Sequence, residues 1–308
     1  MTLRVAIVGL GKIARDQHVP SIARVEGVEL TAVASRNAEH PGVANFATID
    51  ELLDHGDLFD AVALCTPPQG RHEQATKALE AGKHVLLEKP PGATVSEIAP
   101  LVALAKSKGV TLFATWHSRF APAVEPARAL LADAAIRTVR VEWKEDVRKW
   151  HPGQAWIWEP GGLGVFDPGI NALSIATRIL PRALFLRRSD LFFPENRAAP
   201  IAADLAFDDG SGTPIRAEFD WRVTGGETWT IRAETDRGEL VLSEGGKRLH
   251  LAGVAQVEDE DREYEGIYRR FLDLTRTGEL DVDLSPLQLV ADAFLFGRHH
   301  GVEPFVEA

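Results

Sequence analysis

Residues 4–14 read RVAIVGLGKIA, an apolar run that passes directly into a glycine-rich turn. The apolar part fits a buried strand, and Gly9, Gly11 and Ala14 then form a G-x-G-x-x-A pattern that opens a helix. In such a unit the first glycine permits the tight turn, the second lets a pyrophosphate approach the backbone, and the alanine keeps the helix close to the sheet. We therefore predict dinucleotide binding here, with a plain glycine turn as the alternative. The residues predicted to contact the dinucleotide are Gly9, Gly11, Lys12, Ile13 and Ala14.

Short β-branched runs alternate with helical segments from Arg4 to about Thr115. This alternation is typical of βαβ units on a parallel sheet. One helical repeat ends at Gly82, a residue type that suits the left-handed stop of a helix. We predict an α/β fold whose first part, residues 1–118, is a Rossmann domain. The predicted strands are Val5–Val8, Leu30–Ala34, Ala61–Cys65, His84–Leu87 and Val110–Phe113.

The pattern changes after about Trp116. Residues 140–143 and 215–221 alternate apolar and polar side chains, as half-buried antiparallel strands do. We predict that residues 119–308 form a second α/β domain with a large, open and mostly antiparallel sheet, which binds substrate and forms oligomers. Turn signals punctuate this region at residues 208–210, 224–226, 236–238 and 244–246.

Two helices are predicted in this second domain. Ala172–Leu180 should pack on one face of the sheet, and a last helix from Ser285 to about His299 should pack back near the first domain. The other face of an open sheet exposes apolar area, which favours association with a partner. We therefore predict a homodimer formed through the sheet.

The composition limits the class of partner. The 308 residues are enough for two domains, and 45 acidic against 34 basic residues give a net charge of −11. This charge disfavours nucleic acid and anionic membrane surfaces, so a small molecule is the expected partner. Cys65 is the only cysteine and no apolar stretch approaches the ~20 residues that cross a bilayer, so we predict a cytoplasmic protein. His299 and His300 lack a matching carboxylate or cysteine cluster, and no metal site is predicted.

The end of the second predicted strand bears on the choice between NAD and NADP. An acidic residue there would bind the ribose 2′-hydroxyl of NAD. This chain has Ser35 and Arg36 instead, and a hydroxyl beside a planar guanidinium suits a 2′-phosphate. Arg36 could equally stack on adenine and favour neither form. The sequence thus predicts NADP or NAD as cofactor, with NADP favoured.

Two further strands end in short proline-containing motifs. Leu87 is followed by Glu88, Lys89 and Pro90, at the edge where open α/β sheets bind ligands. Lys89 is therefore expected where a nicotinamide and a substrate would meet. A solvated loop lysine is the alternative, but the rigid prolines beside it favour catalysis. The two motifs are predicted to contact the cofactor through Cys65, Thr66, Pro67, Pro68, Glu88 and Lys89.

The glycine turn and these two motifs resemble the glucose-fructose oxidoreductase and inositol dehydrogenase family (Gfo/Idh/MocA), over nearly the whole chain. The resemblance implies a Rossmann domain, then an α/β domain with a large open sheet, and nicotinamide-dependent oxidation or reduction of sugar-like alcohols. Residues 164–171 resemble the family motif in which Asp and His stand four apart. Here they are Asp167 and Asn171, and an amide cannot take up a proton. Lys89 and Asp167 remain as candidates for the general base, Asn171 would hold substrate hydroxyls, and helix N-capping is the alternative for Asp167.

Residues 143–158, with the departure at Asn171, resemble the branch of that family that oxidises aldopyranoses such as galactose and L-arabinose at C1. Aromatic rings beside carboxylate, imidazole and amide groups are the composition of a sugar site. The tryptophans of this run could instead belong to the core, and His117 could be a structural histidine. The residues predicted to bind substrate are Asn171, Glu145, His151, Trp150 and His117.

The expected reaction is oxidation of an aldopyranose, D-galactose above all and also L-arabinose or D-fucose, to an aldonolactone. One alternative is a dehydrogenase of another polyol or aldose, such as inositol or xylose, which Asn171 disfavours. Another is a nicotinamide-binding sensor without turnover, which the joint presence of Lys89 and Asp167 disfavours, because a sensor needs neither.

Overall fold

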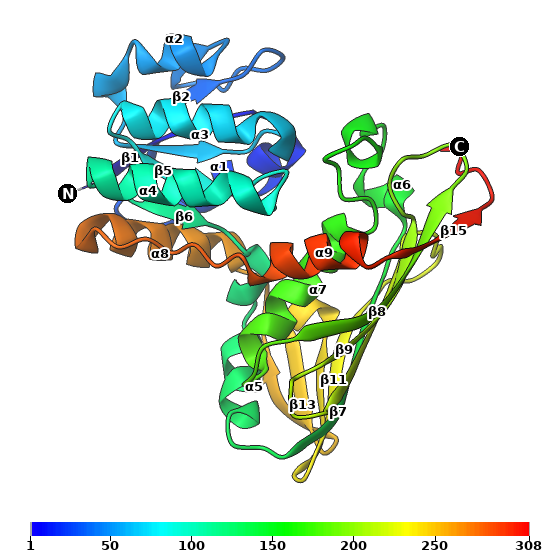
Figure 1. The fold of residues 1–308 in the computed structure, drawn as a ribbon. Helices are drawn as coiled ribbons and strands as arrows, with labels where there is room; N and C mark the ends of the chain where they lie inside the picture. Colours follow the sequence, from blue (N-terminus) through cyan, green and yellow to red (C-terminus); the bar gives the residue numbers. More distant parts are fainter. Residues whose placement is uncertain (1, 308) are drawn as a thin grey trace. The chain divides into compact units, whose positions relative to one another are not determined.

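The structure of the protein is a computed structural model that describes residues 2–307 (Figure 1). The chain folds into two compact units. The first runs up to His117 and also contains Glu263–Asp283, and the second contains Ser118–Arg262 and the chain from Leu284 onward. The sequence predicted a single boundary at residue 118, whereas the segment from Glu263 to Asp283 belongs to the first unit.

The first unit is built on a six-stranded sheet in the order β3-β2-β1-β4-β5-β6, and every neighbouring pair is parallel. This is the strand order of a Rossmann fold, and it confirms the predicted fold class. The predicted strands are all present, whereas the short edge strand β3 was missed. The strands are β1 (Leu3–Val8), β2 (Val28–Ala34), β3 (Ala44–Phe46), β4 (Ala61–Leu64), β5 (His84–Leu87) and β6 (Leu112–Ala114).

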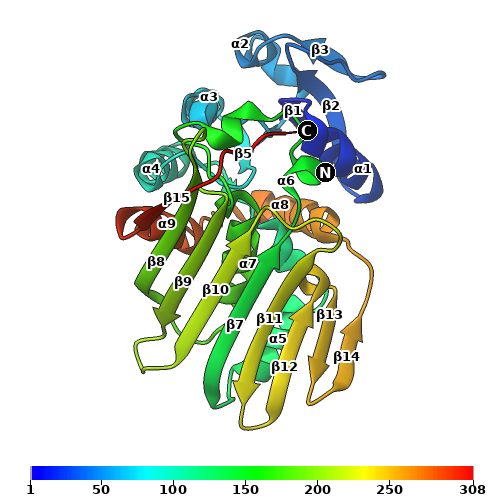
Figure 2. The same ribbon diagram turned by 90° about the vertical axis from the view of Figure 1, so that its right-hand side faces the viewer.

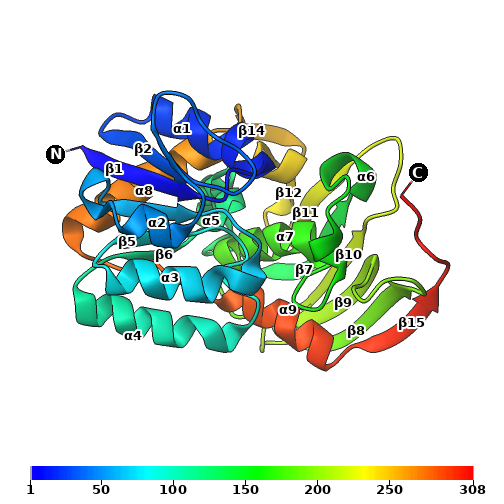
Figure 3. The same cartoon turned by 90° about the horizontal axis from the view of Figure 1, so that it is seen from above.

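Helices cover both faces of this sheet, with α1 and α8 on one side and α3 and α4 on the other (Figure 3). Glu263–Thr277, the helix α8, lies far along the chain and packs against α1, which explains why this segment joins the first unit. The remaining helical segments are η1 (Ala14–His18), α1 (Val19–Arg24), α2 (Ile49–Leu53), η2 (Gly56–Leu58), η3 (Pro68–Gly70), α3 (Arg71–Glu80), η4 (Val95–Glu97), α4 (Ile98–Lys108) and η5 (His117–Phe120).

The second unit contains a nine-stranded sheet in the order β14-β13-β12-β11-β7-β10-β9-β8-β15 (Figure 2). Only the pairs β7 with β10 and β8 with β15 are parallel, so the sheet is mostly antiparallel, as predicted. The four predicted turns join consecutive strands from β9 to β13. The strands are β7 (Ile136–Lys144), β8 (Phe185–Pro194), β9 (Ala202–Asp208), β10 (Pro214–Asp220), β11 (Thr228–Thr235), β12 (Gly238–Ser243), β13 (Arg248–Leu251), β14 (Val254–Glu258) and β15 (Arg298–Val302).

One face of the nine-stranded sheet carries helices α5 (Val124–Leu131) and α7 (Phe166–Ile179). The last helix, α9 (Ser285–Leu295), belongs to this unit and contacts α7 and β8. The prediction that this helix continues to about His299 is wrong, because the chain turns at Gly297 and enters β15. The other short segments are α6 (Val147–Trp150), η6 (Ala155–Trp158) and η7 (Glu244–Gly246).

The other face of this sheet is charged rather than apolar. On β7, Val139 and Val141 are buried toward the helices, while Arg140 and Lys144 alternate with them. Both cations form ion pairs with Glu218 on the neighbouring strand β10. The expectation of an apolar uncovered face is therefore wrong, because the outward positions of the strands hold ionised side chains. In residues 2–307 no helix combines the length and the apolar character that crossing a membrane requires.

Candidate active site

The glycine turn of the first unit leaves room for a ligand at a helix N-terminus. Gly9 follows β1 with a φ of +92°, and its amide donates to the carbonyl of Ala34 at 2.9 Å. A Cβ on Gly9 would lie 2.8 Å from Cγ2 of Thr66, whereas a Cβ on Gly11 would meet nothing within 4 Å. The turn thus packs tightly against the end of β4 and stays open beside Gly11. An open, backbone-lined space of this kind fits a pyrophosphate.

The residues after the turn divide between surface and core. Ala14 is fully buried, as expected for the position where the helix meets the sheet. Ile13 is 37% exposed, and Lys12 lies on the surface in an ion pair with Asp16. An exposed apolar side chain at the helix start is available to cover a bound nucleotide.

The end of β2 carries the two residues predicted to select the cofactor. The amide of Ser35 donates to the carbonyl of Phe46 at 2.8 Å, so the missed strand β3 holds this position. Arg36 is exposed. A half-buried serine and an exposed arginine thus lie at the sheet edge where the adenosine ribose binds in Rossmann folds.

The motif after β4 lies directly beside the glycine turn. The Cys65 amide donates to the carbonyl of Val8 at 2.8 Å, and the Thr66 hydroxyl donates to Gln74 at 2.6 Å. Pro67 is exposed and Pro68 buried, at the start of η3. The four residues therefore form an ordered rim next to the open space at Gly11.

Lys89 follows β5 on a backbone that is held from several sides. Buried Arg71, at the start of α3, donates to the carbonyls of Glu88 and Pro90 and to that of Thr66. The peptide bond between Lys89 and Pro90 is cis. Arg71 thereby ties the ends of β4 and β5 together around a half-buried Lys89. Sequence reasoning missed Arg71, since an arginine at a helix start gives no signal of its target.

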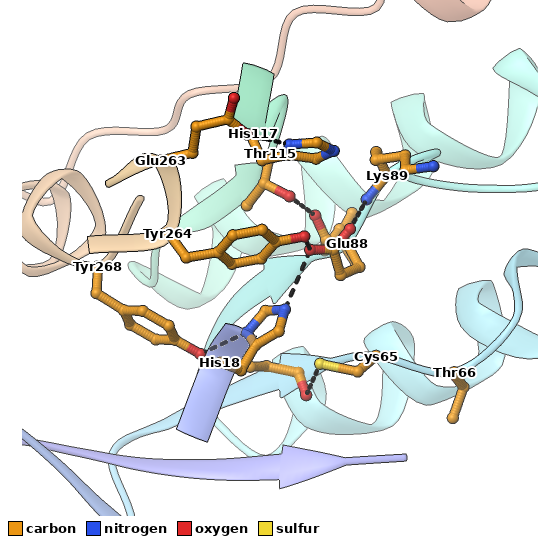
Figure 4. A network of polar contacts seen from close by, with 12 residues as sticks. His18, Cys65, Thr66, Glu88, Lys89, Thr115, His117, Glu263, Tyr264 and Tyr268 are labelled. Carbon is orange, nitrogen blue, oxygen red and sulfur yellow. Dashed lines mark hydrogen bonds and ion pairs between the residues drawn. The ribbon is translucent and has the colours of Figure 1, made fainter. Parts of the chain in front are cut away.

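The Glu88 side chain is buried and points toward His18 and Tyr264 (Figure 4). Its Oε2 accepts the Lys89 amide at 2.7 Å, and its Oε1 accepts the Tyr264 hydroxyl at 2.8 Å. Nε2 of His18 lies 3.0 Å from the same Oε1, and Nδ1 of His18 lies 2.7 Å from the Tyr268 hydroxyl. The carboxylate thus accepts hydrogen bonds from the Lys89 amide, which follows β5, from Tyr264 of α8 and from His18 of η1.

The electrostatics of this cluster favour an ion pair. Burial by itself would raise the pKa of Glu88, but the hydrogen bond and charge of His18 lower it to about 2. Burial would lower the pKa of His18, but Cys65, Tyr268 and the hydrogen bond to Glu88 raise it well above its usual range. Burial and the charge of Glu88 raise the pKa of Tyr264, so its hydroxyl remains a donor. A charged imidazole then donates from both nitrogens.

His117 also lies in the first unit, three residues after the end of β6 and at the start of η5. Its Nδ1 pairs with Glu263, and its ring stacks on Tyr264 with centroids 5.4 Å apart. Burial would lower the pKa of His117, but the charge and hydrogen bond of Glu263 raise it. The contacts with Glu263 and Tyr264 therefore support the alternative interpretation, in which His117 has a structural role.

Four of the five residues predicted to bind substrate, Asn171, Glu145, His151 and Trp150, belong to the second unit, as does Asp167. Asp167 lies in the first turn of α7 and is buried, and Nε2 of His151 is 3.2 Å from its Oδ2. The cap residue of α7 is Val165 and no side chain caps the helix, so the N-capping alternative for Asp167 is wrong. Asn171 follows one turn later, half-buried. The described fold thus joins an aspartate and an imidazole that are 16 positions apart.

Glu145 is held by two indole groups. Its Oε1 accepts Nε1 of Trp221 at 3.2 Å, and its Oε2 accepts Nε1 of Trp229 at 2.9 Å. The His151 ring lies 5.3 Å from that of Trp221. Burial raises the pKa of Glu145, although the indole donors and His151 oppose the shift. Sequence reasoning missed Trp221 and Trp229, which come from β10–β11 and carried no motif.

The tryptophans of residues 143–158 do not share one role. Trp143 and Trp158 are buried, which fits the core interpretation. Trp150, predicted to bind substrate, donates from Nε1 to Glu227 at 3.0 Å, and its ring lies 5.6 Å from that of Trp229. Trp150 therefore borders the Glu145 cluster through Trp229, without a hydrogen bond to Glu145 itself.

Comparisons with known proteins show the family to which the chain belongs. The model of an oxidoreductase family with an NAD-binding Rossmann fold, Gfo/Idh/MocA, matches residues 3–115. Galactose 1-dehydrogenase of Pseudomonas fluorescens is 46% identical over 305 residues, which cover 99% of each chain. The chain belongs to the Gfo/Idh/MocA family of oxidoreductases.

Two solved structures have a similar fold. D-galactose-1-dehydrogenase protein from Rhizobium etli matches with a TM-score of 0.95 at 57% identity, covering 99% of this chain and 98% of that chain. A 3-ketoreductase from Actinomadura kijaniata, in complex with NADP and TDP-benzene, matches with a TM-score of 0.84 at 20% identity, covering 98% and 100%. The second likeness shows the fold alone.

As a Gfo/Idh/MocA member, the protein is an oxidoreductase that uses NAD or NADP. The open space at Gly11, the positive φ of Gly9 and the polar edge at Ser35 fit such a dinucleotide. The backbone of residues 9–14 would hold the pyrophosphate, and Ser35 with Arg36 would lie at the ribose. Within residues 2–307 no group of three or more His, Cys, Asp or Glu side chains could hold a metal ion.

Proposed function

We propose that this protein oxidises D-galactopyranose at C1 to a galactonolactone, with NADP or NAD as the hydride acceptor. The observation that carries the proposal is the similarity to two galactose 1-dehydrogenases over 99% of this chain. The tryptophan-held carboxylate of the second unit supports it, because sugar sites combine aromatic rings with hydroxyl-binding polar groups. L-arabinose and D-fucose share the ring stereochemistry and are expected as further substrates.

In the proposed reaction, the bound nicotinamide supplies the acceptor for the hydride that leaves C1. The chain itself must take up the proton of the C1 hydroxyl, and we assign this role to Lys89 or Asp167. Loss of the proton and the hydride leaves a C1 carbonyl in the ring, which is the lactone. Asn171 cannot take up a proton, so it binds a sugar hydroxyl instead.

His151 and Glu145 are proposed as sugar-binding residues. His151 orients the Asp167 carboxylate through their 3.2 Å contact. Glu145 is kept in place by its two indole donors, with oxygen lone pairs left for sugar hydroxyls. His117 and Trp150 are proposed as neighbours that border the sugar.

The proposal is tested by following the absorbance of the reduced nicotinamide with purified protein. NAD or NADP is supplied with D-galactose, L-arabinose, D-fucose, D-glucose, D-xylose or myo-inositol. Reduction with galactose and arabinose, and none with inositol, is the expected result. Activity confined to inositol or xylose would overturn the proposed substrate. Nucleotide binding without oxidation of any sugar would indicate a sensor. Lys89→Met should lower kcat by about 100-fold or more, the effect of losing a general base.

We propose that Arg36 favours NADP over NAD through the 2′-phosphate. Arg36→Ala should then raise the KM for NADP by about tenfold and leave that for NAD nearly unchanged, since one charge-assisted contact is lost. Equal changes for both cofactors would instead mean that the guanidinium stacks on adenine.

Cofactor binding by the glycine turn has its own matched pair of variants. Gly9→Ala places a Cβ at a strained φ and against Thr66, so it should lower the thermal midpoint even without nucleotide. Gly11→Ala meets no atom of the protein and should leave the midpoint unchanged, while it weakens nucleotide binding. Unaltered binding in Gly11→Ala would show that the pyrophosphate does not approach this turn.

A homodimer through the uncovered face of the nine-stranded sheet is also proposed. This face carries both signs of charge, among them Arg140, Lys144 and Glu218, so a second copy can present complementary charges across a two-fold axis. Burial and the charge of Glu218 raise the pKa of Asp204 on β9. A cation of the second copy placed near Asp204 would therefore stabilise its carboxylate. Sedimentation should give twice 33.7 kDa, with dissociation favoured at high salt. A monomer at every concentration would exclude the dimer.

A further inference from the structure

A buried polar cluster lies immediately behind Lys89, and the proposed reaction does not use it directly. It consists of Glu88, His18, Tyr264 and Tyr268, and each of these side chains is buried in the first unit (Figure 4). Its members come from η1, the end of β5 and α8, so three segments remote in sequence converge on one carboxylate. Glu88 is the centre, because three donors point at its two oxygens.

Stability alone does not account for such a cluster. Burying a carboxylate and an imidazolium costs desolvation free energy that their attraction does little more than repay. Apolar side chains of similar size would fill the same space without that cost. The arrangement is better explained by what the carboxylate contacts outside the cluster.

That contact is the backbone of Lys89. Oε2 of Glu88 accepts the Lys89 amide at 2.7 Å, while Arg71 donates to the carbonyls on either side of this residue. The amide and both flanking carbonyls are therefore fixed by buried charged groups. Only the dihedral angles of the Lys89 side chain remain to place its ammonium nitrogen.

We infer that Glu88 is a positioning residue for Lys89, and that His18 and Tyr264 hold the Glu88 carboxylate in the orientation that this requires. The inference rests on the proposed function, in that Lys89 serves the reaction. His18 donates to one oxygen and supplies the opposite charge, and Tyr264 donates to the same oxygen, which leaves the other for the Lys89 amide. A displacement of about 1 Å in a reacting group can cost on the order of 100-fold in rate.

The test compares two tyrosines on the same helix. Tyr264 donates directly to Glu88, whereas Tyr268 contacts His18, one hydrogen bond further from Lys89. Tyr264→Phe and Tyr268→Phe each remove one buried hydroxyl and keep the ring, so a purely structural role predicts similar effects on stability and activity. We expect Tyr264→Phe to lower kcat about tenfold with KM values for sugar and nucleotide within about twofold, and Tyr268→Phe to change kcat by less than about threefold.

Deuterium at C1 of galactose adds a second readout. If Lys89 is misplaced, the chemical step slows and the isotope effect on kcat should grow in Tyr264→Phe but not in Tyr268→Phe. Glu88→Gln retains an acceptor for the Lys89 amide but loses the negative charge that pairs with His18. It should therefore lower kcat more than Tyr264→Phe does. Thermal midpoints are recorded for all variants, so that a folding defect is recognised.

The outcomes separate this inference from the proposed function. Equal losses in the two tyrosine variants, or a changed KM with unchanged kcat, would overturn the positioning role while wild-type activity and the Lys89→Met loss stand. Absence of sugar oxidation by the wild-type protein would instead overturn the proposed function. An active Lys89→Met variant would overturn the positioning role and assign the proton to Asp167, while the proposed oxidation of galactose would stand.

Discussion

Two glutamates of nearly equal burial differ in their electrostatic surroundings. Glu88 in the first unit is 3% exposed and Glu145 in the second is 4% exposed. The pKa of Glu88 is lowered to about 2, whereas that of Glu145 is raised. Burial pushes both upward, so the difference arises from the partners. Glu88 has a charged imidazole among its donors, and Glu145 has two neutral indoles.

The comparison shows that burial does not decide whether a carboxyl group stays ionised. A full opposite charge at 3.0 Å outweighs desolvation, and two neutral N–H donors do not. Glu88 accordingly stays ionised down to low pH and can accept a hydrogen bond from a backbone amide. Glu145 is more easily protonated, which suits a group that exchanges hydrogen bonds with hydroxyls.

The largest expected effect comes from neutralising each glutamate in turn. Glu88→Gln leaves the His18 imidazolium buried without its counter-charge and should reduce the free energy of unfolding by about 3 to 5 kcal/mol. Glu145→Gln leaves one indole N–H without its acceptor and should cost about 1 to 3 kcal/mol. Urea unfolding at pH 7 measures both. The double variant His18→Gln/Glu88→Gln should lose less than the two single losses combined, and additive losses would contradict the ion pair.

The pH dependence of stability should have opposite signs at the two sites. The lowered pKa of Glu88 stabilises the fold above the ordinary value of 4.5, and about 3 kcal/mol is lost as the pH falls toward 2. The raised pKa of Glu145 stabilises the fold below 4.5, and that contribution is lost as the pH rises through the folded-state value.

Variants isolate these contributions in unfolding curves at several pH values. The deficit of Glu88→Gln against wild type should grow between pH 3 and pH 7. The deficit of Glu145→Gln should shrink between pH 4 and pH 7. The same trend in both variants would remove the contrast between the two glutamates.

The smallest expected effect concerns the indole donors. Trp229→Phe removes the 2.9 Å hydrogen bond to Glu145 and should cost about 1 kcal/mol, with a severalfold increase in the KM for galactose and little change in kcat. Trp150→Phe removes a hydrogen bond to Glu227 and serves as the control, with a change in stability of about 0.5 kcal/mol or less. A larger change in KM for Trp150→Phe than for Trp229→Phe would show that the hydrogen bond of Trp150, and not that of Trp229, matters more for sugar binding.

Local patterns in the sequence predicted most of the fold. The apolar runs and the glycine turn identified five of the six parallel strands, and alternation with turn signals identified the antiparallel sheet. The three-residue strand β3 was too short to give a pattern. The end of α9 was misplaced because a periodic apolar stretch does not show where β15 pairs with β8.

The candidate site was predicted where it depends on strand ends and missed where it depends on distant segments. Lys89 and the glycine turn follow directly from the rule that ligands bind at the carboxyl ends of parallel strands. Tyr264 reaches Glu88 across 176 positions, and Trp229 reaches Glu145 across 84. No local sequence pattern predicts contacts between residues so far apart in the chain.

The sequence by itself determined the cofactor turn, the lysine at the end of β5 and the absence of an imidazole at position 171, because each depends on residues close in the chain. Only the tertiary structure decided what those groups contact. It brought His18 and Tyr264 to Glu88, and His151 to Asp167, by packing α8 against α1 and by folding the segment after β7 back toward α7. Charge and proton affinity depend on neighbours in space, so the opposite behaviour of Glu88 and Glu145 arises only when the chain is folded.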